Sequence, residues 1–305
     1  MMKMFEKIKR RDSHRAKTVY RWFGLTVYAR EVERAGLALE QATVRTSWTL
    51  LGVTGSVFRG RRALQALLIH ARDHARKLSL EHNIVHVSDA DFYVPNFPCD
   101  YVQNVIVNSG DFYERALLDR LRPLIVSGAV ILDIGANIGN HTVYFAKVCG
   151  AKKIHAFEPV RATFEILRRN IELNNLSVTV SAHNWALGDR NGGGRVAALD
   201  AHNIGAQRVA YADSEDAVTM RRLDDADLGE PRVDFVKIDV EGFELEVLAG
   251  GRNFFARHRP LVFVESFGNK ALAVRNFFTL LGYELQVKFP GGNYLFASKT
   301  TGVRR

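Results

Sequence analysis

The sequence predicts an α/β protein: a mostly parallel sheet covered by helices, a C-terminal antiparallel hairpin, and a helical N-terminal extension. Three observations predict this class. From about Asp100 onward, short apolar runs alternate with amphipathic stretches, which favours a parallel sheet covered on both faces. Near the end, two strand-like runs, 283–289 and 294–298, flank a Pro-Gly-Gly turn. In residues 1–90, apolar residues recur at the three- and four-residue spacing of helices.

The expected elements follow in chain order. Prolines near Ser88 to Cys99 interrupt the helical pattern, so we expect two domains, a basic, mainly helical extension over 1–90 and a larger domain over 91–305. The helices of the extension are expected at Phe5 to Ala29, Val32 to Trp48 and Arg62 to Leu80. The strands of the sheet are expected at 130–133, 153–157, 178–182, 235–239 and 261–265, and the helices between them near 141–149, 160–174, 243–256 and 269–281. The long connection 189–232 should hold small strands and part of an acceptor site.

Charge is unevenly distributed along the chain. With 305 residues and 47% hydrophobic content, the chain can bury a full core. Residues 1–90 hold 17 of the 42 Lys and Arg but 8 of the 33 acidic residues, so the net charge of +9 lies there. This asymmetry suggests contact with an anionic partner, such as a membrane face, a polyanionic glycan or nucleic acid. The alternative is a solvated helical surface.

The sequence also indicates a compartment. Cys99 and Cys149 form neither a disulfide framework nor a thiolate zinc pattern, which fits a reducing environment. No secretion signal follows the basic N-terminus, and no apolar run reaches the roughly 20 residues that a membrane span needs. We therefore expect a cytoplasmic protein without a transmembrane segment, either free or held peripherally at a membrane.

The run DIGANIG, Asp133 to Gly139, lies between an apolar strand and a helix. A glycine turn in this context is typical of a nucleotide-type site, because the helix N-terminus offers unpaired N–H groups and glycines allow close approach. Asp133, expected to face the ligand, would repel a pyrophosphate and attract an ammonium and a sulfonium. The motif therefore favours S-adenosyl-L-methionine as cofactor.

Glu158 ends the next predicted strand, 25 positions after Asp133. An acid at this place can accept hydrogen bonds from both ribose hydroxyls. The alternative is that Glu158 caps the helix that begins near Pro159.

Three further acids are expected at the same edge of the sheet. Asp239 and Glu241 follow the fourth strand, where period-two geometry would point both to one side, and Glu265 ends the fifth. One of these carboxylates could act as the general base that removes the proton of a hydroxyl acceptor. The alternative, Mg²⁺ held by the same acids, is not favoured because no ligand spacing specifies a metal. Alternatively, Glu241 caps the next helix and Glu265 forms a structural ion pair.

An ordered set of motifs between Asn108 and Ser298 resembles the FkbM family of S-adenosylmethionine-dependent methyltransferases. The set comprises GDFYE (110–114), VILDIGANIGNHTVYFA (130–146), HAFEP (155–159), RRNIELNN (168–175), ALGD (186–189), LDD (223–225), KIDVEGFELEVLAGG (237–251) and RPLVFVE (259–265). The resemblance implies a class I, Rossmann-like methyltransferase fold and O-methylation of a sugar, a glycan or a small metabolite.

The resemblance also implies roles for residues of this sequence. The residues that would hold the cofactor are Asp133, Gly135, Asn137, Gly139 and Glu158. Asp189 would lie near the adenine, and Tyr113 and Glu114 would close over the methionine end. Residues 1–90 match no pattern of the family.

Other functions are weighed against this one. A nucleic-acid methylase is suggested by the basic pI of 9.6 but is disfavoured, because DVEG stands where a polar residue, two prolines and an aromatic residue are expected. A scaffold that retains the fold without turnover stays open. An NAD-dependent oxidoreductase is disfavoured by Asp133 and Asn137. Two histidine pairs, His70 with His74 and His82 with His86, have helical zinc spacing but lack the glutamate of zincins, so no metal site is predicted.

Overall fold

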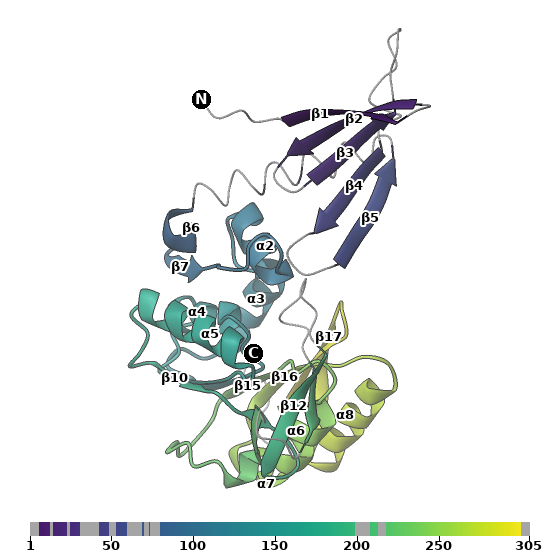
Figure 1. Ribbon diagram of the computed structural model, residues 1–305. Helices are drawn as coiled ribbons and strands as arrows, with labels where there is room; N and C mark the ends of the chain where they lie inside the picture. The colour runs from purple at the N-terminus through teal and green to yellow at the C-terminus, as the bar shows by residue number, and fades with distance from the viewer. Residues whose placement is uncertain are drawn as a thin grey trace. The chain divides into compact units, whose positions relative to one another are not determined.

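The computed structural model describes residues 80–198, 208–212 and 218–299, with Ile69, Asp73 and five strands between residues 6 and 59 (Figure 1). The chain divides into two compact units, Met1–Ser79 and Leu80–Arg305. The boundary lies about ten residues before the predicted one.

The described part of the first unit is a five-stranded antiparallel sheet in the order β1-β2-β3-β4-β5. Its strands are β1 Glu6–Asp12, β2 Arg15–Trp22, β3 Leu25–Arg30, β4 Thr43–Trp48 and β5 Val53–Arg59. The helices predicted over 5–29 and 32–48 are therefore wrong at the residues that form β1 to β4. These segments are rich in Thr, Val, Tyr and Trp, which favour strands, and apolar spacing in short runs does not distinguish the two. The helix predicted at 62–80 falls almost wholly outside the described residues, although Ile69 and Asp73 are helical.

The second unit begins with a small hairpin that packs on a later helix. The strands β6 (Ile84–Val87) and β7 (Ala90–Tyr93) pair antiparallel after the short η2 (Glu81–Asn83). The side chains of Asn170 and Asn174 accept hydrogen bonds from the β7 main chain, at Tyr93 N (2.6 Å) and Asp91 N (3.0 Å). The helices α2 (Tyr101–Ser109) and α3 (Arg115–Leu121) and the short η3 (Arg122–Leu124) follow.

The main sheet has seven strands in the order β10-β9-β8-β15-β16-β18-β17. The first five are parallel: β8 Val130–Ile134, β9 Lys153–Phe157, β10 Val180–His183, β15 Phe235–Ile238 and β16 Leu261–Glu265. The C-terminal hairpin of β17 (Tyr283–Phe289) and β18 (Asn293–Ser298) is antiparallel, and β18 pairs with β16. The α/β class, the five parallel strands and the hairpin are thus present as predicted. From β8 the chain continues to β9 and then β10 on one side of β8. From β15, the neighbour on the other side of β8, it continues outward to β16. The strand order therefore reverses between β8 and β15.

Helices cover both faces of this sheet (Figure 1). One face packs against α2, α3, α4 (Asn140–Lys147) and α5 (Arg161–Leu173), and Ile131, Phe235 and Phe263 belong to its core. The other face packs against α6 (Glu244–Gly250), α7 (Arg252–His258) and α8 (Gly268–Leu280), with Leu132 and Val236 in its core. The single helix predicted near 243–256 is therefore two, separated at Gly251. Successive residues of each strand enter opposite cores, as a strand's period of two requires.

A second, four-stranded sheet fills the long connection, as predicted. Its order is β11-β14-β12-β13, and its strands are β11 Ala186–Leu187, β12 Gly192–Ala198, β13 Arg208–Tyr211 and β14 Val218–Arg221. The short η5 (Leu223–Asp225) then leads toward β15. Within the described residues, no helix is long and apolar enough to cross a membrane.

Candidate functional site

A cavity opens at the carboxyl ends of β8, β9, β15 and β16, beside the point where strand order reverses. In open parallel sheets this is the crevice in which ligands bind. The cavity encloses about 980 Å³, its open mouth included. Eight of the eleven predicted site residues line it: Tyr113, Glu114, Gly135, Asn137, Glu158, Asp239, Glu241 and Glu265.

The floor of the cavity is the turn after β8. Gly135 has a φ of +79°, and a Cβ there would lie 1.8 Å from the main-chain oxygen of Asp239. Only glycine allows this close approach of the turn to the end of β15. Asn137 also has a positive φ, +51°, and its buried Oδ1 has no hydrogen-bond partner among the described residues. A buried acceptor of this kind suits a ligand that brings donor groups.

Glu158 lies at the end of β9 and is held in place by two main-chain N–H groups. Its Oε2 accepts a hydrogen bond from Asn137 N (3.0 Å) and its Oε1 from Val160 N (2.9 Å). The side chain is buried, and burial raises the pKa of Glu158 to about 7. The bond to Val160 N is local, whereas the bond to Asn137 N joins Glu158 to the turn after β8, so capping and ligand binding are compatible.

Asp133 lies in β8 beneath the turn rather than in the cavity wall. It is fully buried, and its Oδ2 accepts a hydrogen bond from Thr142 Oγ1 (2.6 Å). Its other oxygen lies 3.3 Å from the Nζ of Lys237. The prediction that Asp133 faces the ligand is wrong, because strand alternation turns its side chain toward α4, on the face to which Ile131 belongs.

Lys237 is a site residue that the sequence analysis missed. It lies in the middle of β15, is 2% exposed, and donates a hydrogen bond to Gly135 O at 2.6 Å. Burial would lower the pKa of Lys237, but the charges of Asp133 and Asp239 outweigh burial and raise it. A lysine inside an apolar strand was the available signal, since lysine is almost never fully buried unless it is paired.

Two of the predicted acids form a pair across neighbouring strands. Asp239 and Glu265 follow and end β15 and β16, which are hydrogen-bonded neighbours, and their side chains share a hydrogen bond. Burial would raise the pKa of Asp239, but the Lys237 ammonium, 3.3 Å from its Oδ2, and the bond to Glu265 lower it. Burial and the Asp239 charge raise the pKa of Glu265 to about 9. The pair therefore holds one proton at neutral pH.

Glu241 reaches the cavity by a route different from the predicted one. The strand β15 ends at Ile238, and Glu241 and Gly242 have φ values of +51° and +95°, so the chain turns instead of continuing extended. Glu241 lines the cavity nonetheless. At the start of α6, Glu244 accepts the hydrogen bond of Gly242 N at 2.6 Å, and capping by Glu241 stays an alternative.

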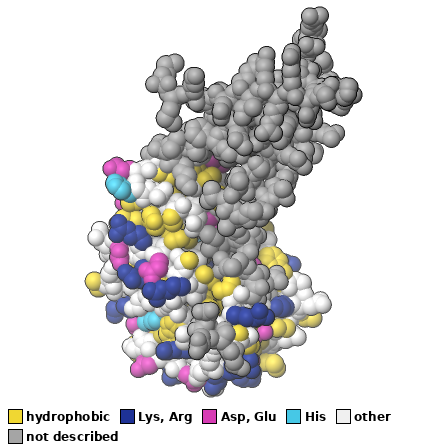
Figure 2. All heavy atoms as spheres, in the orientation of Figure 1, with side chains coloured by type: hydrophobic (Ala, Val, Ile, Leu, Met, Phe, Trp, Pro, Cys, Tyr) yellow, Lys and Arg dark blue, Asp and Glu magenta, His cyan; other side chains and the backbone are white. Residues whose placement is uncertain are grey.

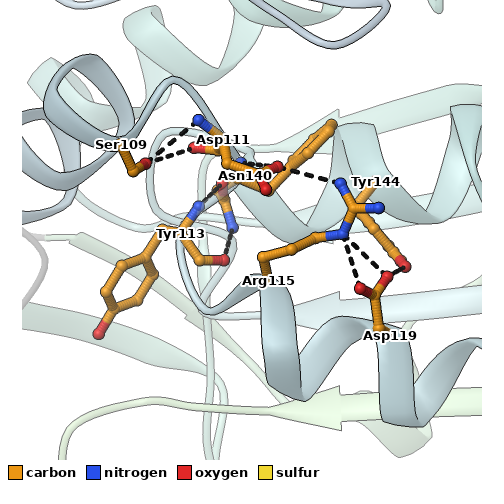
Figure 3. Close-up of polar contacts among 8 residues, drawn as sticks. Ser109, Asp111, Tyr113, Arg115, Asp119, Asn140 and Tyr144 are labelled. Carbon is orange, nitrogen blue, oxygen red and sulfur yellow. Dashed lines mark hydrogen bonds and ion pairs between the residues drawn. The ribbon is translucent and has the colours of Figure 1, made fainter.

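The segment Asp111–Glu114, which we call the strap, lies at the wall of the cavity and is tied to α4 and α3 (Figure 3). Asn140 makes two hydrogen bonds with the main chain of Tyr113, and Arg115 joins Asp111 (3.0 Å) to Asp119 (2.8 Å). Figure 3 shows the Tyr113 ring pointing away from this network. The main-chain ties thus hold the strap while the Tyr113 ring takes part in the cavity wall.

Gly139 and Asp189 do not line the cavity. Gly139, with a φ of +89°, packs against α5, where a Cβ would lie 2.7 Å from Leu167 Cδ1. Asp189 accepts a hydrogen bond from the Tyr211 hydroxyl. The contacts of both residues are with the protein, and their role in cofactor binding stays a prediction.

An aromatic wall completes the cavity. Trp185 lines it together with Phe157, and the guanidinium of Arg221 lies 4.2 Å from the Trp185 ring. At another part of the wall, Tyr101 is 54% exposed and its ring meets that of Tyr113 at 5.9 Å. Neither Trp185 nor Tyr101 could be found from the sequence motifs, because neither lies in a motif that contains glycines or acids.

The described residues contain no group of three or more His, Cys, Asp or Glu that could hold a metal ion. His82 and His86 are not on one helix: His86 lies in β6, where its Nδ1 is 2.8 Å from Asp91. His70 and His74 lie outside the described residues.

Comparisons with known proteins place these features in a family. Residues 133–285, about half of the chain, match the family model described as Methyltransferase FkbM domain. The protein Methyltransferase 1 of Beauveria bassiana is 35% identical over 144 residues, which cover 39% of this chain and 57% of that protein. The hexuronic acid methyltransferase AglP of Haloferax volcanii is 33% identical over 129 residues, which cover 41% of this chain and 50% of that protein.

The chain thus spans 50 to 57% of the length of these two curated relatives. Among solved structures, the FkbM methyltransferase of Methylobacillus flagellatus KT aligns at 17% identity with a TM-score of 0.43, covering 65% of this chain and 55% of that one.

Proposed function

The chain belongs to the FkbM methyltransferase family, and we propose that it transfers the methyl group of S-adenosylmethionine to a hydroxyl of a sugar, a glycan or a small metabolite. The single observation that supports this proposal most is the cavity at the strand reversal, where Glu158 stands at one side and the Asp239–Glu265 pair at another. The sheet order, with a terminal antiparallel hairpin, supports the class I methyltransferase fold.

The residues present fit this cofactor. S-adenosylmethionine supplies a methyl group activated by a sulfonium, and brings a ribose, an adenine and a methionine ammonium. We propose that the Glu158 carboxylate accepts hydrogen bonds from the ribose hydroxyls and that Asn137 Oδ1 accepts another hydrogen bond from the ligand. Trp185 and Phe157 offer apolar surface for the adenine. Tyr113 and Glu114 of the strap would then lie at the methionine end.

Asp239 is proposed as the general base. With S-adenosylmethionine bound, the Asp239 carboxylate would accept the proton of the acceptor hydroxyl, and the cofactor would supply the methyl group and retain the sulfur as a thioether. Asp239 can accept a proton because its lowered pKa keeps the carboxylate ionised at neutral pH, and its side chain is 30% exposed in the cavity. Glu241 lies in the same wall and would contact the acceptor. The remaining work of the site is to align the two partners and exclude water.

The carbohydrate class of acceptor is supported by the likeness to a hexuronic acid methyltransferase and by the Tyr101 ring at the cavity wall. An aromatic ring offers the apolar surface that the C–H face of a sugar can cover. We further propose that residues 1–90 contact an anionic surface through their excess of Lys and Arg. The protein would then be cytoplasmic, either free or held peripherally at a membrane. On the face of the second unit shown in Figure 2, Lys and Arg are dispersed among acidic side chains.

Calorimetric titration with S-adenosylhomocysteine, followed by NADH, tests the cofactor. We expect micromolar binding of the first compound only. Asp239→Asn should bind S-adenosylhomocysteine and lose methyl transfer to any acceptor found by screening. Binding of NADH alone would overturn the proposal, and turnover by Asp239→Asn at the wild-type rate would overturn the base.

A further inference from the structure

The buried Lys237 ammonium lies between the acid pair, Asp239 and Glu265, and the turn after β8 (residues 135–139), which we call the cofactor turn. Lys237 and Asp133 are paired residues on neighbouring parallel strands, and Lys237 Nζ lies 3.3 Å from Asp133 Oδ1. The same Nζ is 3.3 Å from Asp239 Oδ2 and 2.6 Å from Gly135 O. Three acceptors from β8, its turn and the end of β15 thus meet at one cation.

Charge balance at this point decides where the single proton of the acid pair lies. A buried ion pair is tolerated only when its charges and hydrogen bonds are closely matched. Lys237 contributes one positive charge against the carboxylates of Asp133 and Asp239, which already leaves one net negative charge. Ionisation of Glu265, hydrogen-bonded to Asp239, would add a second negative charge with no cation at contact distance among the described residues. The proton therefore belongs on Glu265.

Other charged and titratable groups face the pair from every neighbouring element. The acidic ones are Glu114 of the strap, Glu241 after β15 and Glu244 of α6, and the remaining ones are His141 of α4 and the Tyr113 phenol. His141 Nε2 lies 3.4 Å from Glu114 Oε2, and a positive charge on this imidazole also lowers the pKa of Asp239, after Lys237 and the hydrogen bond to Glu265. Lys237 is the cation in direct contact with Asp239.

We infer that Lys237 is a positioning residue that keeps the Asp239 carboxylate ionised beside a protonated Glu265, and that fixes this carboxylate to the cofactor turn through Gly135 O. Glu265 then donates its hydroxyl hydrogen to Asp239 and orients it. The catalytic importance of this arrangement rests on the proposed function, because that function makes Asp239 the base. The ionisation pattern itself does not depend on any ligand.

Carboxyl ¹³C signals of the full chain, labelled at Asp and Glu side chains and followed against pH, test this inference. Loss of one signal in Asp239→Asn and of another in Glu265→Gln assigns the pair. In the wild type, we expect Asp239 to be ionised throughout the neutral range while Glu265 stays protonated until the pH approaches 9. An ionised Glu265 beside a protonated Asp239 at pH 7 would overturn the inference.

The lysine variants test the cause. Lys237→Met removes the charge and keeps most of the side-chain volume. The midpoint pH of the Asp239 carboxyl titration should therefore rise by about one to three pH units. Lys237→Arg keeps the charge and should restore a midpoint close to that of the wild type. Lys270→Met is the matched control, since Lys270 contacts Gly242 O and not the pair, and it should leave the midpoint unchanged. A folded Lys237→Met variant with an unshifted Asp239 midpoint would sink the inference.

A second measurement covers the case in which Lys237→Met does not fold. The ¹⁵N signal of Lys237 Nζ in the wild type should remain that of an ammonium at pH 10, with slow exchange of its protons because the group is 2% exposed. A neutral amine at that pH would remove the cation on which the inference depends. These signals need neither cofactor nor acceptor, so absent S-adenosylhomocysteine binding would refute the proposed function and leave this result standing.

Discussion

The side-chain amide of Asn140 forms two reciprocal hydrogen bonds with the main chain of Tyr113 (Figure 3). Nδ2 donates to Tyr113 O at 3.0 Å, and Oδ1 accepts from Tyr113 N at 2.9 Å. Because an amide offers a donor and an acceptor side by side, it satisfies both main-chain groups of one residue. The strap is thereby fixed to the first turn of α4, the helix that follows the cofactor turn.

Replacing Asn140 should loosen the strap. Asn140→Ala leaves two partly buried main-chain groups of Tyr113 without partners, which we expect to cost about 1 to 3 kcal/mol of unfolding free energy. S-adenosylhomocysteine should also bind more weakly, because Tyr113 and Glu114 lose their fixed position. Thermal unfolding and calorimetry measure the two effects. Asn108→Ala, which removes a side-chain bond to Asn104 within α2, is the control and should leave the affinity unchanged. Equal affinity losses in both variants would contradict a specific role for the strap.

Glu158 should make cofactor binding depend on pH. Burial raises its pKa to about 7, whereas hydrogen bonds from ribose hydroxyls favour its ionised form. The affinity for S-adenosylhomocysteine should therefore rise between pH 5 and pH 8. Glu158→Gln should bind at least about tenfold more weakly at pH 8, consistent with the loss of hydrogen bonds to a charged group, and should lose the pH dependence. Glu172→Gln, the same change on the exposed side of α5, should retain it. An unchanged pH profile in Glu158→Gln would exclude the ribose role.

The same carboxyl should affect stability in the ligand-free protein. The folded state holds the Glu158 proton more tightly than an ordinary glutamate with a pKa of 4.5. Its contribution to stability is therefore fully present below about pH 4.5 and is lost as the pH rises through about 7. Glu158→Gln should flatten the fall in unfolding free energy over this window, which denaturant unfolding at several pH values measures. A fall as steep as in the wild type would show that another group causes it.

Gly135 should tolerate no side chain. Gly135→Ala places a Cβ 1.8 Å from Asp239 O and also strains a φ of +79°, so the turn and the end of β15 must separate. Gly110→Ala is the matched control, since its φ is +66° but no atom lies within 4 Å of the added Cβ. We expect the control to lose about 1 kcal/mol from backbone strain and Gly135→Ala to lose more, together with cofactor binding. Equal losses of stability in chemical denaturation would argue against the close approach.

The acceptor should be uncharged or cationic rather than anionic. The cavity wall includes five acidic side chains, Glu114, Glu158, Asp239, Glu241 and Glu265, and among its described residues no Lys, Arg or His. The proposed function places Asp239 and Glu241 at the acceptor, where their negative charges would repel an added carboxylate. In assays of S-adenosylhomocysteine release, the rate with a neutral sugar should be at least about tenfold higher than the rate with its matched uronate. Glu241→Gln should reduce this ratio of rates. Preference for the uronate would refute this expectation.

The parallel strands could be predicted because buried parallel strands are continuous apolar runs. The runs that became β8, β9 and β15 are bounded by glycines, acids or prolines, and these boundaries also marked the site. The strands β1 to β4 were mistaken for helices because their short runs fit either period, and only their β-branched and aromatic content distinguished them. Their pairing depends on contacts between segments, which no local pattern contains.

Strand-end acids were the predictable part of the site. Glu158, Asp239 and Glu265 follow from the rule that ligands bind at the carboxyl ends of parallel strands. The position of Asp133 could have been corrected from strand alternation alone. The bonds of Asn140 and Lys237 could not be predicted, because each joins segments that only the folded chain brings together, from α4 to the strap and from β15 to the turn after β8.

Because β18 is a partner of β16, the strand that carries Glu265 gains its neighbour late in synthesis of the chain. β16 ends in Glu265, and in the described part of the chain its outer edge pairs with β18, for example Glu265 with Asn293. A nascent chain in which residues 293–298 are still inside the ribosome has an apolar strand with one open edge, a surface prone to wrong pairing. The strand bearing one half of the acid pair can therefore be secured only after the last hairpin has emerged. Pausing or truncation before that hairpin should favour chaperone capture over maturation.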